Sequence, residues 1–186
     1  ATLVDWIYNR NRPYDDLVPE KVAEYFNMIM HNTTQSPWDL MATGGNFMSD
    51  GMGTAFSSEL IVDENSGGYA WEGFDGNVYY PNHTIEEINN TLKVFMGIDN
   101  YIIMENLPYD GIHHIDMHMK LLNEETLLIA EYPEGVADGP QIEANIQYIL
   151  ENYNSAFGTP YDVIRIPSPP SSSGNYPDNN GYYRTY

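Results

Sequence analysis

The sequence predicts an α/β protein whose strands and helices follow a repeated order. Three segments have apolar residues at helical spacing, and short strand-like runs, most of them bounded by Gly or Pro, lie between them. The order strand, turn, strand, helix, strand occurs over residues 44–104 and again over 111–166. Because repeats of this kind bury their apolar faces against neighbouring units, we expect that two such units do not stand alone.

The three predicted helices have recognisable start and stop signals. The first covers about 19–31 and opens with a proline, which suits the first turn of a helix. The second begins at a capping box formed by Thr84 and Glu87 and stops at Gly97. The third runs from about Asp138. Each has one apolar face, which predicts packing against a core.

Six short runs are predicted to be strands. A segment rich in Gly and aromatic residues, 63–81, interrupts the first repeat. We interpret it as an insertion that packs on itself, on a ligand cleft or on a partner. The segment 167–183 has no periodic apolar pattern and is interpreted as a connector. The predicted strands are Asn46–Met48, Thr54–Val62, Tyr101–Met104, Ile115–Leu122, Thr126–Glu131 and Val163–Ile166.

Composition excludes several classes of partner and site. The chain has 27 acidic and 7 basic side chains, which give a formal net charge of −20. This charge disfavours binding to nucleic acid and to anionic membranes. No run approaches the roughly 20 apolar residues that a membrane span needs. Cysteine is absent, which excludes a disulfide framework, a zinc ribbon and a thiol nucleophile carried by this chain. Few Lys beside abundant Asn, Tyr and Gly favour a secreted or cell-surface protein.

The densest polar cluster lies at 111–120. If this segment is a strand, period-two alternation places four polar side chains on one face: His114, Asp116, His118 and Lys120. Three interpretations remain open at this point. They are a metal site completed by ligands from elsewhere, an acid/base pair that handles a cationic substrate, and a structural polar ladder.

Two arginines form a second polar group, in a chain that has few cations. Arg10 and Arg12 stand two residues apart in a short loop, and their planar guanidinium groups could hold a substrate carboxylate through paired hydrogen bonds. The alternative is ion pairing with Asp15 or Asp16.

A third segment, Thr43–Gly51, combines glycines with the carboxylate of Asp50. Glycines there permit a close approach of backbone near a cleft. Their spacing matches neither nucleotide-binding fingerprint, so we do not expect a phosphate loop. We interpret Asp50 as structural support or as part of the rim of the site, and not as a residue that contacts the substrate.

Three segments together resemble one family. Ile7–Pro13, Gly44–Gly51 and His113–Asp116 are similar to segments of the bacterial (Porphyromonas-type) peptidylarginine deiminase family, which is related to the agmatine deiminases. The resemblance covers essentially the whole chain. It implies the pentein fold, a five-bladed pseudosymmetric α/β propeller of which this chain would supply roughly two to three blades, including the two repeats.

The resemblance also implies hydrolysis of a guanidinium group without a cofactor or a metal. A cysteine thiolate attacks the guanidinium carbon, ammonia leaves, and water releases a ureido product such as citrulline. His114 would be the general acid/base, and Asp116 would bind the guanidinium nitrogens. Arg10 and Arg12 would hold the α-carboxylate of a C-terminal arginine. Since agmatine has no carboxylate, the pair favours an arginine-containing peptide over an agmatine-like substrate.

One departure from the family pattern affects the activity. The family's nucleophilic cysteine belongs to a late His-Cys segment, and this chain contains no cysteine. We therefore expect an internal fragment that is inactive alone and needs complementary fragments of the same domain or identical chains as partners. The alternative is a non-catalytic structural or assembly module derived from the same fold.

Overall fold

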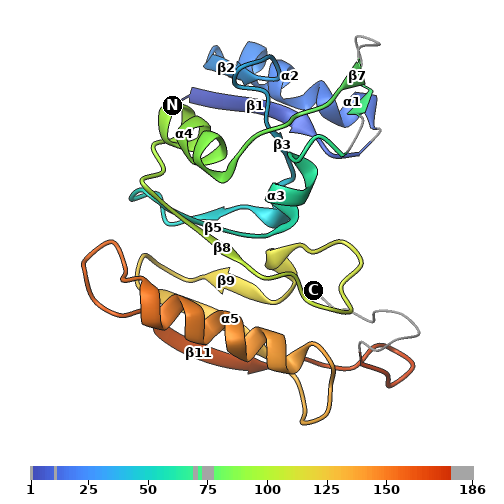
Figure 1. Cartoon of the computed structure of the whole chain (residues 1–186), viewed down its shortest axis with the longest axis vertical. Helices are drawn as coiled ribbons and strands as arrows, with labels where there is room; N and C mark the ends of the chain where they lie inside the picture. The colour runs from blue at the N-terminus through green and yellow to red at the C-terminus, as the bar shows by residue number, and fades with distance from the viewer. Residues whose placement is uncertain (1, 11, 69–70, 73–77, 177–186) are drawn as a thin grey trace. The chain divides into compact units, whose positions relative to one another are not determined.

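The computed structural model describes residues 2–10, 12–68, 71–72 and 78–176, and the chain forms two compact units (Figure 1). The first unit comprises 1–43 and 61–99, and the second comprises 44–60 and 100–186. Strands and helices alternate through both, which confirms the predicted α/β class.

A parallel sheet forms the centre of the first unit. Its strand order is β2-β1-β3, and Ile7 of β1, only 2% exposed, lies opposite Met41 of β3. Parallel neighbours need a crossover between them, and α2 supplies it between β1 and β2. The bounds are β1 (Thr2–Tyr8), α1 (Pro13–Asp16), α2 (Val18–Phe26), β2 (Ile29–Thr33) and β3 (Met41–Ala42).

The rest of the first unit contains α3 (Leu60–Glu64) from Ile61 onward, the short hairpin strands β6 (Trp71–Glu72) and β7 (Val78–Tyr79), and α4 (Ile85–Met96). The predicted capping box of α4 is confirmed, because the Thr84 hydroxyl and the Glu87 carboxylate each accept a hydrogen bond from the other residue's backbone N–H. Gly97 ends the helix with a φ of 70°, as predicted.

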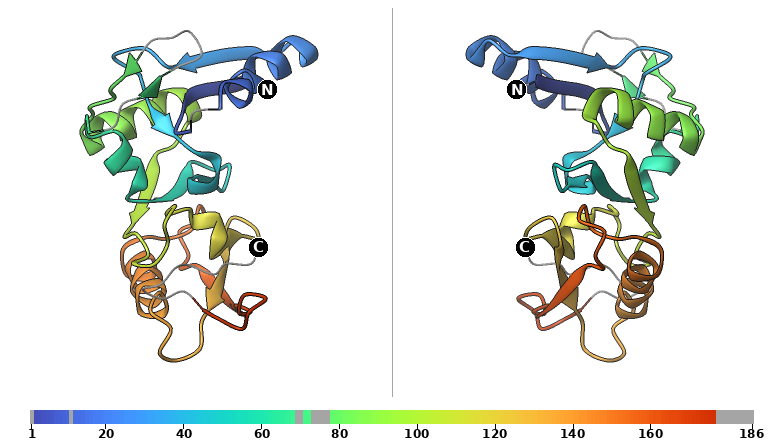
Figure 2. Two further views of the ribbon diagram at one scale, coloured as in Figure 1. Left: turned by 90° about the vertical axis from the view of Figure 1, so that its right-hand side faces the viewer. Right: turned by 90° about the vertical axis from the view of Figure 1, so that its left-hand side faces the viewer.

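Two three-stranded sheets in the second unit share one pattern. In each, the first strand is antiparallel to the second and the third is parallel to the second. The first sheet contains β4 (Met48–Ser49), β5 (Thr54–Ser58) and β8 (Asn100–Met104), and the other contains β9 (Met119–Leu121), β10 (Thr126–Glu131) and β11 (Asp162–Pro167). In the chain, α5 (Gly139–Asn152) follows β10 and precedes β11. The helix lies along one side of their sheet (Figure 2).

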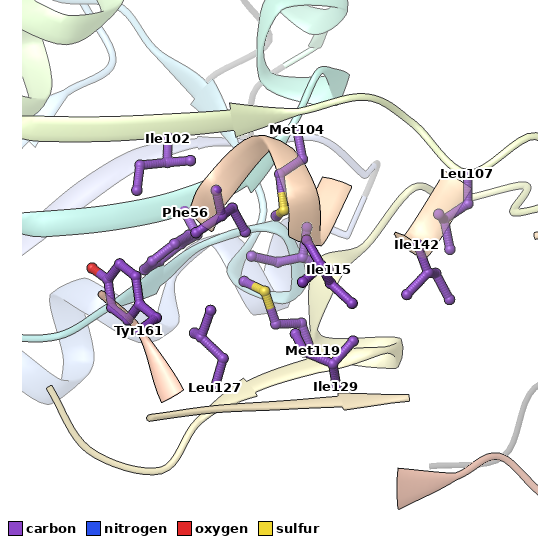
Figure 3. Close-up of a cluster of buried hydrophobic side chains, with 12 residues drawn as sticks. Phe56, Ile102, Met104, Leu107, Ile115, Met119, Leu127, Ile129, Ile142 and Tyr161 are labelled. Atoms are coloured by element: carbon purple, nitrogen blue, oxygen red, sulfur yellow. The ribbon is translucent and has the colours of Figure 1, made fainter. Parts of the chain in front are cut away.

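The core of the second unit joins both sheets to α5 (Figure 3). Ile115, which comes from a turn and not from a strand, lies among these side chains and is only 1% exposed. The buried members are Phe56, Ile102, Met104, Leu107, Ile115, Met119, Leu127, Ile129, Ile142, Ile146, Ile149 and Tyr161. Burial of an isoleucine of this kind contributes roughly 1.5–3 kcal/mol.

The predicted helix at 19–31 is too long. It ends at Phe26 because Asn27 adopts a left-handed conformation with a φ of 50°, which turns the chain. The following residues form β2 and bond to β1, so sheet pairing overrides the apolar periodicity that suggested a longer helix.

Three predicted strand boundaries are also wrong. The run Thr54–Val62 is a strand only to Ser58, after which α3 begins. The run Asn46–Met48 ends a 3₁₀ helix, Gly44–Asn46, and starts β4. The run Ile115–Leu122 becomes a strand only at Met119, because Ile115–Met117 form a 3₁₀ helix that inserts Ile115 into the core.

Parts of two predicted segments lie outside the described residues. These are 69–70 and 73–77 of the insertion and 177–183 of the connector. No helix within the described ranges is long and apolar enough to cross a membrane.

Candidate active site

A short turn in the second unit carries two of the predicted site residues. His113 has a φ of 54°, a left-handed conformation that is uncommon outside glycine, and His114 is extended directly before the 3₁₀ helix Ile115–Met117. Within this helix, Ile115 is buried and Asp116 is exposed. His114 and Asp116 therefore flank an anchored residue on one turn.

Hydrogen bonds hold the turn at both ends. The Ser58 hydroxyl donates to the carbonyl of His113 at 2.6 Å, and the backbone N–H of Ala130 donates to the carbonyl of His118 at 2.8 Å. Ser58 is itself fixed, because its backbone N–H donates to the Asn46 side-chain oxygen at 2.9 Å. These bonds tie the turn to β5 and β10 and restrict its movement.

The ring of His114 packs directly on the backbone of Gly45. A Cβ added at Gly45 would lie 2.4 Å from Nδ1 of His114, far inside normal contact distance. The predicted close backbone approach in the 43–51 segment is thus present. Asp50 closes the same segment, since its Oδ1 accepts from the backbone N–H groups of Met52 and Thr54 at 2.7 and 2.9 Å.

Charges around Asp116 oppose one another. Burial raises the pKa of Asp116 above its ordinary value, His114 and Lys120 act to lower the pKa, and Asp110 acts to raise it further. His114 and Lys120 lower the pKa of Asp116 through their charges. A bound cation would favour the carboxylate form of Asp116 in the same way. The environment suits a carboxylate that meets a positively charged group.

Asp116 also lines an open cleft of about 290 Å³. Two other polar side chains on its wall, His118 and Lys120, come from the same segment. Met117, apolar side chains of the β9–β11 sheet and the segment 167–169 complete the lining. The cleft belongs to the second unit alone.

The predicted common face of four polar residues is wrong. Because 115–117 are helical, the alternation starts only at Met119; His118 is buried, at 8% exposed, whereas Asp116 and Lys120 are exposed. Across the described ranges, no three His, Cys, Asp or Glu side chains gather in a group that could hold a metal ion.

Arg10 and Arg12 lie in the first unit, in the loop that follows β1. Both are exposed, and the backbone N–H of Arg12 donates to the carbonyl of Arg10 at 2.8 Å. Arg12 pairs with Asp15 at 3.5 Å, the ion pair that the sequence offered as an alternative. With both side chains more than half exposed, such a pair contributes about 0–1 kcal/mol.

A buried carboxyl beside this loop was missed by sequence reasoning. Glu64, at the end of α3, is 5% exposed, and Asn9 donates its side-chain N–H to Oε1 of Glu64 at 2.5 Å. Burial raises the pKa of Glu64 to about 7, against the lowering effects of Asn9 and Arg10. No local pattern marks Glu64, since it follows another acidic residue in a polar stretch.

The first unit has a cleft of its own, about 230 Å³ in volume. It is lined by acidic and aromatic side chains together with Val4 and Pro19: Asp5, Asp15, Asp16, Trp6 and Tyr8. Burial, with the charges of Asp16 and Glu20, raises the pKa of Asp5 to about 6.

Comparison with known proteins identifies the family. The model of the Porphyromonas-type peptidyl-arginine deiminase family matches residues 1–186, the whole chain. The chain belongs to this family. It is a family of deiminases that act on guanidino groups, and this member chain contains no cysteine.

This chain spans about half the length of the similar proteins that it matches. A relative from Mycoplasma mycoides named "Putative agmatine deiminase" is 23% identical over 180 residues, which cover 89% of this chain and 44% of the relative. Agmatine deiminase of Enterococcus faecalis matches with a TM-score of 0.69 and 18% identity, over 97% of this chain and 50% of that structure. C. jejuni agmatine deiminase with substrate bound matches with a TM-score of 0.62 and 16% identity, over 97% of this chain and 48% of that structure. The α/β fold is therefore that of the pentein deiminases over about half of their length.

Proposed function

We propose that this chain contributes to the active site of a deiminase that converts peptidyl arginine to citrulline. The observation that carries the proposal is the turn that holds His114 and Asp116 together, in a chain that matches a deiminase family along its whole length. The proposed substrate is a peptide that ends in arginine.

Asp116 is proposed to bind the substrate guanidinium. A guanidinium is planar, cationic and rich in N–H donors, and a carboxylate can accept two of these at once. The exposed position of Asp116 on the wall of the cleft leaves its carboxylate accessible to such a group. The charge of His114 acts on Asp116, which supports the proposal that the proton-transfer group and the guanidinium-binding group work on the same substrate group.

His114 is proposed to transfer protons in both halves of the reaction. It first protonates the departing nitrogen, which leaves as ammonia, and then takes a proton from the water that attacks the covalent intermediate. An imidazole suits both steps because it titrates near neutral pH. Packing of the ring on Gly45 restricts its orientation, as a precise acid/base group requires.

Arg10 and Arg12 are proposed to hold the α-carboxylate of the substrate. Both guanidinium groups are exposed, and the ion pair between Arg12 and Asp15 is weak enough to be exchanged for a substrate carboxylate. Agmatine offers no such group, so the pair supports a peptidyl or carboxylate-bearing arginine.

The nucleophile must come from a segment outside these 186 residues, because the chain has no cysteine. Identical copies cannot supply it, so the proposed catalytic partner is a complementary segment of the same domain. The thiolate of that segment attacks the guanidinium carbon, and hydrolysis of the adduct returns the thiolate and leaves a ureido group. The greater length of the relatives supports this proposal.

The test is reconstitution. We expect this chain, mixed with a cysteine-bearing complementary segment of the family, to form a ureido product from a peptide that ends in arginine. Asp116→Asn and His114→Ala should each lower the rate by at least about 100-fold, the range typical of acid/base and binding groups. The matched control is Asp162→Asn, an exposed carboxyl in the same unit. Equal rates for Asp116→Asn and Asp162→Asn would refute the assignment.

A second candidate function is a non-catalytic assembly module. The specific observation in its favour is that β11 exposes two isoleucines, Ile164 and Ile166, each 48% exposed. Exposed apolar side chains on a sheet suit contact with another protein surface. A native chain of 21.2 kDa that assembles with its own copies and gives no ureido product in any mixture would favour this function.

A further inference from the structure

A buried carboxyl lies next to the arginine loop and takes no part in the chemistry proposed above. We infer that Glu64 is a positioning residue that orients the turn at Asn9 and Arg10 and controls how tightly Arg10 binds a substrate carboxylate. The inference rests on the proposed function, since it takes Arg10 as the group that binds the carboxylate.

The position of Glu64 is set by its neighbour Asn65, which is fully buried. The Asn65 side chain accepts from the backbone N–H of Met41 at 2.9 Å, and it donates to the carbonyls of Met41 and Ile61 at 2.8 and 2.7 Å. These bonds fix α3 to β3. Because β3 pairs with β1 at Ile7 and Tyr8, Glu64 is held in register with the residue that follows β1, which is Asn9.

The two oxygens of Glu64 have different environments. Oε1 accepts the hydrogen bond from Asn9 at 2.5 Å. Oε2 is buried and accepts no hydrogen bond from any described residue. A buried carboxylate oxygen without a donor is costly, so the group either binds a proton or attracts a cation.

Charged side chains of two elements act on Glu64. Arg10, from the loop after β1, favours the carboxylate form, and Asp63, its neighbour in α3, disfavours it. Asn9 favours the carboxylate through its hydrogen bond. Arg10 is thus the described cation whose charge favours the carboxylate form of Glu64.

This attraction competes with substrate. Burial raises the pKa of Glu64 to about 7, so both forms are populated near neutral pH. As pH rises through 7, Glu64 loses its proton and becomes negatively charged. The ionised Glu64 then attracts the Arg10 guanidinium and competes with a substrate carboxylate for it. Binding of arginine peptides with a free C-terminal carboxylate should therefore weaken on the alkaline side, whereas binding of amidated peptides should not change.

The first experiment measures the coupling without any activity. In the full chain, NMR would follow the side-chain carboxyl carbon of Glu64 and Nε of Arg10 between pH 5 and 9. We expect an inflection near pH 7 in both signals. The inflection of Arg10 should vanish in Glu64→Gln, which keeps an acceptor for Asn9 but cannot titrate, and should persist in Glu86→Gln, an exposed carboxyl of the same unit. An Arg10 signal that does not follow Glu64 overturns the inference.

The second experiment measures specificity in the reconstituted enzyme. From pH 6 to pH 8, KM for the peptide with a free carboxylate should rise about threefold, and kcat should stay unchanged. A rise of this size is what the weakening of one exposed charge pair, that between Arg10 and the substrate carboxylate, would cause. KM for the same peptide with a C-terminal amide should stay constant, and Glu64→Gln should abolish the rise. A rise that persists in Glu64→Gln, or one shared by the amide, overturns the role of Glu64. Absence of ureido product from every substrate instead refutes the proposed function, and the NMR result still decides whether Glu64 orients Arg10.

Discussion

The turn at 113–117 and the loop residues Asn9, Arg10 and Arg12 differ in what holds them. The turn is anchored by Ile115 in the core of the second unit, and backbone carbonyls at its two ends receive hydrogen bonds from β5 and β10. Among the described residues of the loop in the first unit, Asn9 donates a side-chain hydrogen bond to Glu64, Arg12 forms an exposed ion pair with Asp15, and the backbone N–H of Arg12 donates to the carbonyl of Arg10. Its guanidinium groups are exposed.

This difference matches the two tasks that we propose. Proton transfer requires a group held close to its productive geometry, because small displacements reduce rates strongly. Recognition of a flexible peptide end tolerates side chains that adjust, as long, exposed arginines do. The contrast predicts that changes beneath the turn will cost stability and catalysis together, and that changes at the loop will mainly alter substrate affinity.

The largest expected effect is at Ile115. Ile115→Ala removes a side chain that is 1% exposed and packed between both sheets, so the free energy of unfolding should fall by about 2–5 kcal/mol. Urea denaturation measures this value. The matched control is Ile164→Ala, because Ile164 is 48% exposed and its loss should cost less than about 1 kcal/mol. Similar values for the two variants would show that the turn is not anchored by the core.

Next in size is the pH dependence contributed by Glu64. Its pKa in the folded chain, about 7, lies above the ordinary 4.5, so folding favours the protonated form. The resulting stabilisation is fully present below pH 4.5 and is lost as pH rises through 7. Between pH 5 and 8, the free energy of unfolding of the wild type should therefore fall relative to that of Glu64→Gln, by on the order of 2–3 kcal/mol. Denaturation of both proteins at each pH measures this difference. If the unfolding free energies of the two proteins changed in parallel with pH, Glu64 would be ionised in the folded chain across this range.

The third prediction tests how the His114 ring is held. Gly45→Ala would place a methyl group 2.4 Å from Nδ1 of His114, so the ring or the 44–46 segment must move. We expect a loss of about 1–3 kcal/mol in unfolding free energy, together with a shift of the His114 ring signals in NMR. The adjacent Gly44→Ala is the control, because an added Cβ there meets nothing within 4 Å. Unchanged His114 signals in Gly45→Ala would exclude a packing role.

Local signals in the sequence were sufficient for the parts of the fold that local chemistry decides. The capping box at Thr84 and the stop at Gly97 were predictable, because each depends on one or two residue types at fixed spacing. The glycines of 43–51 indicated a close backbone approach, but they did not indicate that the ring of His114 would be the partner. The helix end at Phe26 was not, because pairing of β2 with β1 competes with helical periodicity, and such pairing involves residues far apart in the chain.

The candidate site was predictable in composition but not in geometry. His114 and Asp116 stood out as polar residues, but period-two alternation predicted that they share one strand face with His118. In the structure Ile115–Met117 form a 3₁₀ helix that buries Ile115, and His118 is buried whereas Asp116 is exposed. Glu64 gave no signal, because its burial follows from the bonds of Asn65 to β3, which no local pattern reveals.

The smallest expected effect concerns the ion pair at the loop. Asp15→Asn removes the partner of Arg12, but both side chains are more than half exposed, so stability should change by less than about 1 kcal/mol. In the reconstituted enzyme, KM for a peptide with a free C-terminal carboxylate should fall up to about fivefold, because Arg12 no longer has an intramolecular competitor. Steady-state kinetics with the free and the amidated peptide measure this effect, and the amide should show none. A stability loss as large as that of Ile115→Ala would contradict the contrast between an anchored turn and an adaptable loop, since it would mean that Asp15 holds the loop as firmly as the core holds the turn.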